Sequence, residues 1–322
     1  MLTVLTTLLL SAPAHAKKDR TYTAVRVDLD GRPGLCSGEV QKLGLYGTDD
    51  KGKERKIRFG QWKAFQISWD IGPVSPKGAL EMPLDPEPAW GKPGLVQVQS
   101  IDDPSVVATA QLPARYDCDL VLTREGAPGA SGVAGERGSA EAESSGGPGQ
   151  NGGNGQSGGN GPDLEVRVHL ATDPVSGAEV LQVAVKDLST GESWNSAVGA
   201  QGGHMAIRTV GGMGGAGGAG GEGGTAAPGY NGGNGGHGGN GGNGGNGGAI
   251  TVLADAAAVP AMGVLEFLHP GGVAGLAGPG GAGGQGFEPG EPGQSGPAGH
   301  AGTEGAPGPE TDVQIQPVGP IW

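Results

Sequence analysis

Apolar and polar residues alternate in short segments along the first part of the chain. The segments 25–29, 65–69, 96–98 and 120–122 each place an apolar residue at every second position. A period of two is typical of half-buried β-strands, and glycine, proline and aspartate separate these segments as they do in turns. About seven such strands over 20–124 predict a β-sandwich.

Apolar segments also occur in the second part of the chain, where they separate long glycine-rich blocks. We expect strands at 164–170, 180–185, 205–210, 250–253, 264–268 and 313–315. The sequence Asp-Pro-Val-Ser-Gly at 173–177 is rich in turn formers and predicts that the first two strands form a hairpin. The apolar faces of these strands need a partner, so we expect a small β-core from which the glycine blocks project.

Glycine occupies every third position in three blocks, 126–163, 211–249 and 272–310. Each block has five triplets, a short break, and then six or seven more triplets. A glycine period of three fits the extended left-handed helix of the polyproline-II type, whose backbone groups must bond to a neighbour. We interpret each block as a hairpin of two such polyglycine-II helices. The block 211–249 repeats Gly-Gly-X and leaves two bare faces per helix, so it should lie between the other two blocks.

Two alternatives stay open for the glycine blocks. Glycine supplies 71 of the 322 residues, and such a composition also occurs in disordered linkers. Gly-X-Y triplets also build the collagen triple helix, for which the proline-rich block 272–310 is the best candidate. The order of the six helices in a bundle cannot be deduced from the sequence.

The first sixteen residues combine an apolar run with the pattern Ala14-His15-Ala16, which is typical of a cleaved secretory signal peptide and is too short to span a bilayer. We therefore expect an exported protein, located outside the cell, at its surface or in the periplasm. In such a compartment Cys36 and Cys118 should form a disulfide. The expected division is 1–16 signal peptide, 17–125 β-sandwich and 126–322 glycine-rich bundle with interleaved strands.

Charge is distributed unevenly between these two parts. Residues 17–125 contain 16 basic and 16 acidic residues, whereas 126–322 contain 4 basic and 17 acidic residues. The net charge of −13 therefore arises in the glycine-rich part. An acidic surface of this kind repels nucleic acid and anionic lipid, so neither is an expected partner. We also expect no transmembrane segment.

Several resemblances follow from these patterns. Cys36, Trp69, Tyr116 and Cys118 occur in an order that resembles immunoglobulin-like domains. The alternation of glycine triplets with strands resembles the N-terminal domain of the Obg GTPases, where polyglycine-II helices stand on a small β-structure, although this chain has no GTPase domain. The triplets also resemble the glycine-rich repeats of mycobacterial PGRS proteins and of secreted bacterial collagen-like proteins. Together these resemblances imply an all-β fold with a polyglycine-II bundle.

Two parts of the bundle offer side chains for binding. An array of polar residues spaced by about 9.3 Å would follow one helix of block 211–249, and the breaks between helices would place larger side chains at the tips. The candidate residues are Tyr230, Asn231, Asn234, His237, Asn240, Asn243, Asn246, Phe287 and Glu288.

No spacing in the sequence indicates a catalytic, metal or cofactor site. The Gly-x-Ser-x-Gly match at 155–159 lies inside a triplet repeat, and the P-loop match at 47–53 lacks its Ser or Thr. We expect a non-enzymatic structural or adhesive protein that contacts a cell-surface glycan or protein. The alternatives are an ice- or glycan-binding module with a repetitive Asn/Ala face and a collagen-like trimer, although a monomer fits the short triplet runs better.

Overall fold

A computed structural model describes residues 22–29, 34–75 and 78–322, so the expected signal peptide at 1–16 lies outside the described residues. The fold is all-β, as expected, and the helical parts of the described residues are three short 3₁₀ segments. These are η1 (Phe59–Ala64), η2 (Glu87–Ala89) and η3 (Val259–Val264). The chain divides into two compact units. The described residues of unit 1 are 22–29, 40–75, 78–81 and 94–112, and unit 2 comprises Gly34–Glu39, Met82–Pro93 and Pro113–Trp322.

Unit 1 contains two three-stranded sheets and a two-stranded sheet. Their orders are β1-β3-β4, β5-β7-β8 and β2-β6. The bounds are β1 (Tyr22–Asp28), β2 (Val40–Lys42), β3 (Gly44–Asp49), β4 (Glu54–Lys56), β5 (Phe65–Trp69), β6 (Ala79–Glu81), β7 (Gly94–Ser100) and β8 (Val107–Leu112). Leu45 of β3 and Val98 of β7 are buried in one cluster with Ile57 and Phe65. The two larger sheets therefore pack as a sandwich, because residues of both meet in one core.

Unit 2 has two sheets that share a second core. A five-stranded sheet has the order β12-β11-β10-β14-β16, and a three-stranded sheet has the order β15-β13-β9. The bounds are β9 (Asp119–Glu125), β10 (Leu164–Thr172), β11 (Glu179–Asp187), β12 (Ser193–Gly199), β13 (His204–Val210), β14 (Ile250–Ala254), β15 (Leu265–Leu268) and β16 (Asp312–Ile315). Val166 and Val183 of the larger sheet are fully buried with Ile207 of the smaller one.

The six strands expected in the second part are all present, and strand β12 was not foreseen. The expected hairpin is confirmed, since β10 and β11 pair antiparallel. Its turn is closed by Asp173, whose carboxylate accepts hydrogen bonds from the N–H and hydroxyl of Ser176. Strand β12 was missed because its sequence, Ser-Trp-Asn-Ser-Ala-Val-Gly, does not alternate.

The boundary between the units differs from the expected break at 125/126. Strand β9 pairs parallel with β13 and belongs to unit 2. The expected disulfide is formed, with the Cα atoms of Cys36 and Cys118 6.1 Å apart, but both cysteines also lie in unit 2. It therefore does not close the sandwich of unit 1. The immunoglobulin-like order is divided in the same way, because Trp69 is buried in unit 1 and Tyr116 in unit 2.

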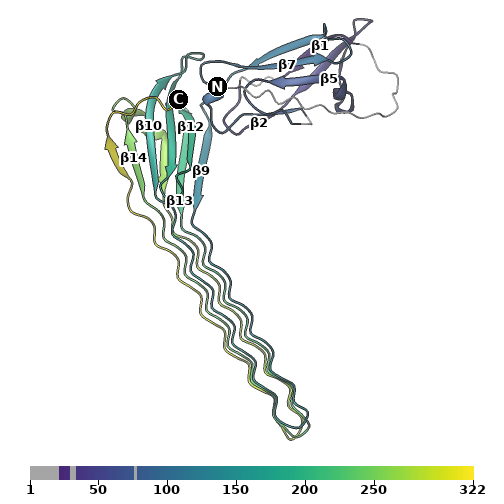
Figure 1. Ribbon diagram of the computed structural model, residues 1–322, viewed down its shortest axis with the longest axis vertical. Helices are drawn as coiled ribbons and strands as arrows, with labels where there is room; N and C mark the ends of the chain where they lie inside the picture. Colours follow the sequence, from purple (N-terminus) through teal and green to yellow (C-terminus); the bar gives the residue numbers. More distant parts are fainter. Residues whose placement is uncertain (1–21, 30–33, 76–77) are drawn as a thin grey trace. The chain divides into compact units, whose positions relative to one another are not determined.

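Glycine-rich runs extend from the β-core of unit 2 at the ends of its parallel strands (Figure 1). We number them run 1 (126–140), run 2 (146–163), run 3 (211–225), run 4 (231–249), run 5 (270–286) and run 6 (290–311). Runs 1, 3 and 5 follow β9, β13 and β15, and runs 2, 4 and 6 lead into β10, β14 and β16. Because these two sets of strands are neighbours in the two sheets, the bundle is a continuation of the two-layered β-core.

Backbone hydrogen bonds join each run to its neighbours at every triplet. Within one layer, Gly132 of run 1 donates to Ala216 of run 3, and Gly217 of run 3 donates to Leu276 of run 5, both at 2.8 Å. Between layers, Gly218 of run 3 donates to Gly153 of run 2, also at 2.8 Å. Runs 3 and 4 bond to runs of both other blocks, which confirms that the Gly-Gly-X block is interior. The partners are runs of the same chain, in place of the partner chains of a collagen triple helix.

Candidate functional site: the faces and tip of the bundle

The interior of the bundle has room for glycine alone at most positions that face a neighbour. A Cβ atom added to Gly215 or Gly218 of run 3 would lie well inside 3.0 Å of a carbonyl oxygen of run 1. No run glycine in the described part has φ in the left-handed region, so the requirement is space and not backbone conformation. The three-residue spacing of these contacts is what a helix with three residues per turn needs. Polyglycine II stays our interpretation of the run geometry.

Asparagine followed by glycine forms a repeated pair of hydrogen bonds, which we call the Asn–Gly clamp. The side-chain oxygen of Asn234 accepts the N–H of Gln294 at 2.9 Å, and the N–H of Gly235 donates to the carbonyl of Gln294 at 2.8 Å. One dipeptide thus holds both backbone groups of one residue in the next run. The dipeptides that do this begin at Asn151, Asn154, Asn160, Asn231, Asn234, Asn240, Asn243 and Asn246.

His237 interrupts the asparagines of run 4, and its partner in run 6 explains why. The residue that Gly238 bonds to is Pro297, whose carbonyl accepts at 2.9 Å. Proline has no N–H, so no side-chain acceptor is needed opposite it. Histidine therefore occurs in run 4 where the clamp would have nothing to accept.

The predicted polar array lies on an exposed face formed by runs 2, 4 and 6, which we call the polar face. Asn231, Asn234, Asn240, Asn243 and Asn246 are exposed there with His237. However, the side-chain oxygens of these five asparagines already accept backbone hydrogen bonds from run 6. The array therefore joins runs 4 and 6 as well as facing solvent. The sequence did not reveal this role, although one signal was available: each of these asparagines precedes a glycine.

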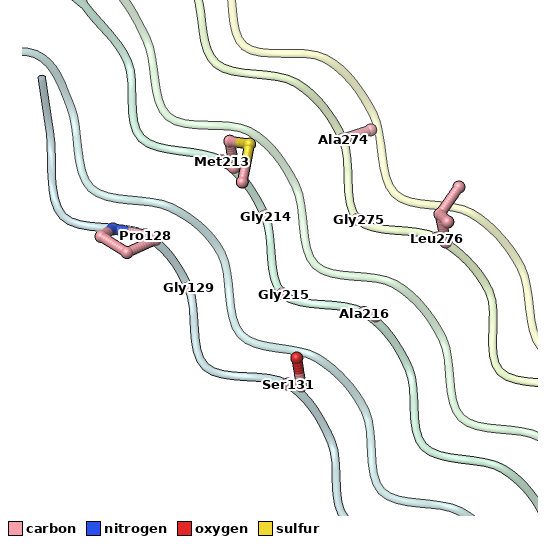
Figure 2. Close-up of a pocket in the computed structure, with 10 residues that line it drawn as sticks. All are labelled: Pro128, Gly129, Ser131, Met213, Gly214, Gly215, Ala216, Ala274, Gly275 and Leu276. Atoms are coloured by element: carbon pink, nitrogen blue, oxygen red, sulfur yellow. The ribbon is translucent and has the colours of Figure 1, made fainter.

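The opposite layer carries a different set of side chains, which we call the apolar face. Met213 and Val273 are each 60% exposed and Leu276 is 75% exposed. Pro128 of run 1, Met213 of run 3 and Leu276 of run 5 surround a shallow depression of about 370 Å³ near the sheet end of the bundle (Figure 2). The two faces of the bundle thus differ in polarity, which the triplet pattern did not predict.

The three breaks between runs meet at the far end of the bundle, which we call the tip (Figure 1). Its turns are joined by backbone hydrogen bonds, from Ala227 to Ser144 at 3.2 Å and from Gly229 to Phe287 at 3.1 Å. The side chains of Tyr230 and Phe287 are 45% and 44% exposed, and Glu288, which follows Phe287 in sequence, is also exposed. The structure therefore brings the predicted tip residues together and separates them from most of the polar array.

Carboxylates of the bundle are concentrated towards the tip. Those in the last triplets and the breaks are Glu136, Glu141, Glu143, Glu222, Glu288 and Glu291. Runs 3, 4 and 5 contain no other charged residue than Glu222. Arg137 is the one basic residue of the runs, and it lies 3.7 Å from Glu222. The tip is therefore acidic and aromatic.

The described residues contain no group of three or more His, Cys, Asp or Glu side chains placed to hold a metal ion. No helix in the same residues is long and apolar enough to cross a membrane. Comparison with protein-family models, curated protein sequences and solved structures finds no match to this chain. Inferences about function therefore depend on the geometry of the bundle.

Proposed function

We propose that this chain is a non-enzymatic, exported protein of the secreted bacterial glycine-rich type, in which the bundle is a stiff stalk and the tip is an adhesive surface. The observation that carries the proposal is the exposure of Tyr230 and Phe287 where the three turns meet. Large aromatic rings in solvent are favourable contact residues for a partner, since they bury much area with few rotatable bonds. Their partner would be a glycan or protein on a cell surface.

Two further observations support this reading. Each run is hydrogen-bonded to at least two others along most of its length, so bending the stalk would break many backbone hydrogen bonds at once. The disulfide between Cys36 and Cys118 fits an oxidising compartment, in agreement with the leader expected at 1–16. The polar face supports binding to ice or to a crystalline glycan less well, because its asparagine oxygens are used within the bundle.

The test compares surfaces coated with the full chain and with two double variants. Tyr230→Ser with Phe287→Ser changes the tip, and Met213→Ser with Leu276→Ser is a matched control on the apolar face. All four positions are exposed, so each substitution should change the stability by less than about 0.5 kcal/mol. Capture of cells and of arrayed glycans should fall with the first variant alone. Equal capture by the wild type and the tip variant would refute a tip-mediated contact.

A further inference from the structure

Eight of the nine asparagines in the chain precede a glycine, and all eight lie in runs 2 and 4. The ninth, Asn195, precedes a serine in strand β12. Asn–Gly is the dipeptide in which the asparagine side chain is most easily attacked by the backbone, because glycine has no side chain to obstruct the approach. The bundle therefore contains a concentrated set of chemically reactive pairs.

The reaction needs two groups of the dipeptide to be free. The glycine nitrogen loses its proton and attacks the side-chain carbonyl carbon, a C–N bond forms, and ammonia leaves to give a cyclic succinimide. Water then adds to one of the two ring carbonyls, and the ring opens to aspartate or to isoaspartate. No oxidant and no reagent other than water is required, so at a given pH and temperature the folded structure decides whether the reaction proceeds.

The Asn–Gly clamp engages both reacting groups in hydrogen bonds to a third residue. In the clamp on His300, the glycine nitrogen of Gly241 donates to the carbonyl of His300 at 2.8 Å, and the side-chain oxygen of Asn240 accepts the N–H of His300 at 2.8 Å. Closing the five-membered ring requires both bonds to break, because the nitrogen must lose the proton that it donates and the side-chain carbonyl must move to meet that nitrogen. The same pair of bonds is present at all eight dipeptides.

We propose that the eight clamped Asn–Gly pairs are latent deamidation sites that the closed bundle protects, so that opening of a run becomes irreversible once isoaspartate forms in it. Isoaspartate adds a methylene to the backbone, which breaks the three-residue period on which every contact of the bundle depends. Aspartate preserves the period. Asp163 shows that a carboxylate serves in this position, because it accepts the N–H of Ala249 at 2.8 Å while Leu164 donates to the carbonyl of Ala249.

The structure also predicts the order in which the asparagines react. Runs 2 and 4 are anchored at the sheet end, where Leu164 and Ile250 begin buried strands, and each of the two runs begins at a turn at the tip. Local opening begins where few buried contacts resist it, which here is the tip. Asn231 should therefore react first among the asparagines of run 4, and Asn246 last.

The experiment incubates the full chain, folded and in denaturant, at one pH and temperature, and maps amide-to-acid conversion at each asparagine by mass spectrometry. In the folded protein the clamped sites should react at least about tenfold more slowly than in denaturant, because reaction waits for opening. Conversion should rank from Asn231 to Asn246. Equal rates in the two states would overturn the proposal, and so would a folded-state order unrelated to distance from the tip.

A variant separates chemical change from other consequences of ageing. Asn234→Asp with Asn240→Asp and Asn243→Asp retains a carboxylate acceptor of the Asp163 kind and removes three reactive amides. After ageing in denaturant, the wild type should refold to a smaller yield than this variant, with the unaged yields as references. If the aged wild type refolded with the same yield as the unaged wild type, the proposal that opening becomes irreversible would be contradicted. Replacement of the same three residues by serine, the residue found at Ser157 in run 2, controls for the added charge.

Discussion

Two adjacent glycines of run 2 provide the sharpest test of the bundle geometry. Gly158 faces run 3, and a Cβ atom there would lie well inside 3.0 Å of the carbonyl oxygen of Gly212. Gly159 faces run 1, where the nearest atom to an added Cβ is the backbone nitrogen of Ala127 at 3.3 Å. Gln150 and Gln156 occupy the same position within their triplets as Gly159, so side chains already occur at equivalent places in run 2. The same substitution at the two positions should therefore have very different effects.

The expected sizes follow from these contacts. Gly158→Ala forces runs 2 and 3 apart, and overpacking of this kind costs about 1–3 kcal/mol. Displacement also weakens bonds such as that from Gly158 to Asn243, each worth about 1 kcal/mol, so we expect a total near 3 kcal/mol. Gly159→Ala requires a shift of a few tenths of an ångström, and it gains about 0.4–1 kcal/mol from the less flexible unfolded chain. We expect a net change within about 1 kcal/mol for Gly159→Ala.

The assay is amide hydrogen exchange of the run glycines by NMR, together with urea unfolding of the full chain. Exchange reports the opening of the bundle itself, whereas unfolding also includes unit 1. Gly158→Ala should speed exchange in runs 2 and 3, and Gly159→Ala should leave it nearly unchanged. If both variants accelerated exchange equally, the glycines would be required for some reason other than contact with a particular neighbour.

Three further predictions test particular bonds. Asn240→Ser removes a clamp oxygen and should destabilise the chain by about 0.5–1.5 kcal/mol, whereas His237→Ser should be neutral in the same urea titration. His237→Asn combined with Pro297→Ala creates a ninth Asn–Gly clamp, and a double-mutant cycle should give a stabilising coupling of about 1 kcal/mol that neither single variant shows. Asp187 tests pH dependence: burial acts to raise its pKa, but hydrogen bonds from Ser189 and Thr190 lower the pKa overall. Because the folded-state pKa is depressed, this stabilisation is complete above the ordinary value of about 3.9 and is lost as pH falls through the folded-state value. Asp187→Asn should therefore reduce the dependence of the unfolding free energy on pH below about 3.9. An unchanged pH dependence in that acid range would contradict this role of Asp187.

The sequence was sufficient for the elements with a strict period. The alternation in 164–170 and 180–185 and the turn between them predicted strands β10 and β11 and their pairing. The glycine phase predicted hairpins, and the Gly-Gly-X pattern of 211–249 predicted that this block lies inside. These predictions succeeded because each follows from a local rule about which residue types fit a repeating backbone.

The division into units could not be predicted in the same way. Strand β9 follows the sandwich in the chain but pairs with β13, about 85 residues later, because its partner is chosen by packing and not by proximity in sequence. The clamps were missed for a related reason. Asn234 and Gln294 are 60 positions apart, and nothing in either residue alone shows that they meet.

The order of the strands also explains how so much glycine becomes ordered. Fixing a glycine costs more backbone entropy than fixing any other residue, about 1–2 kcal/mol or more, and the net gain from each new hydrogen bond is about 1 kcal/mol. A bundle of glycine runs alone would therefore be marginal. Here the runs continue strands that are already paired in register: runs 1, 3 and 5 follow β9, β13 and β15, and runs 2, 4 and 6 lead into β10, β14 and β16. The first hydrogen bonds of every run are therefore set by a core that includes Val166, Ile207 and Val252. The apolar core at one end thus supplies the alignment that lets the runs bond without side-chain packing, and the tip is the place where that influence is weakest.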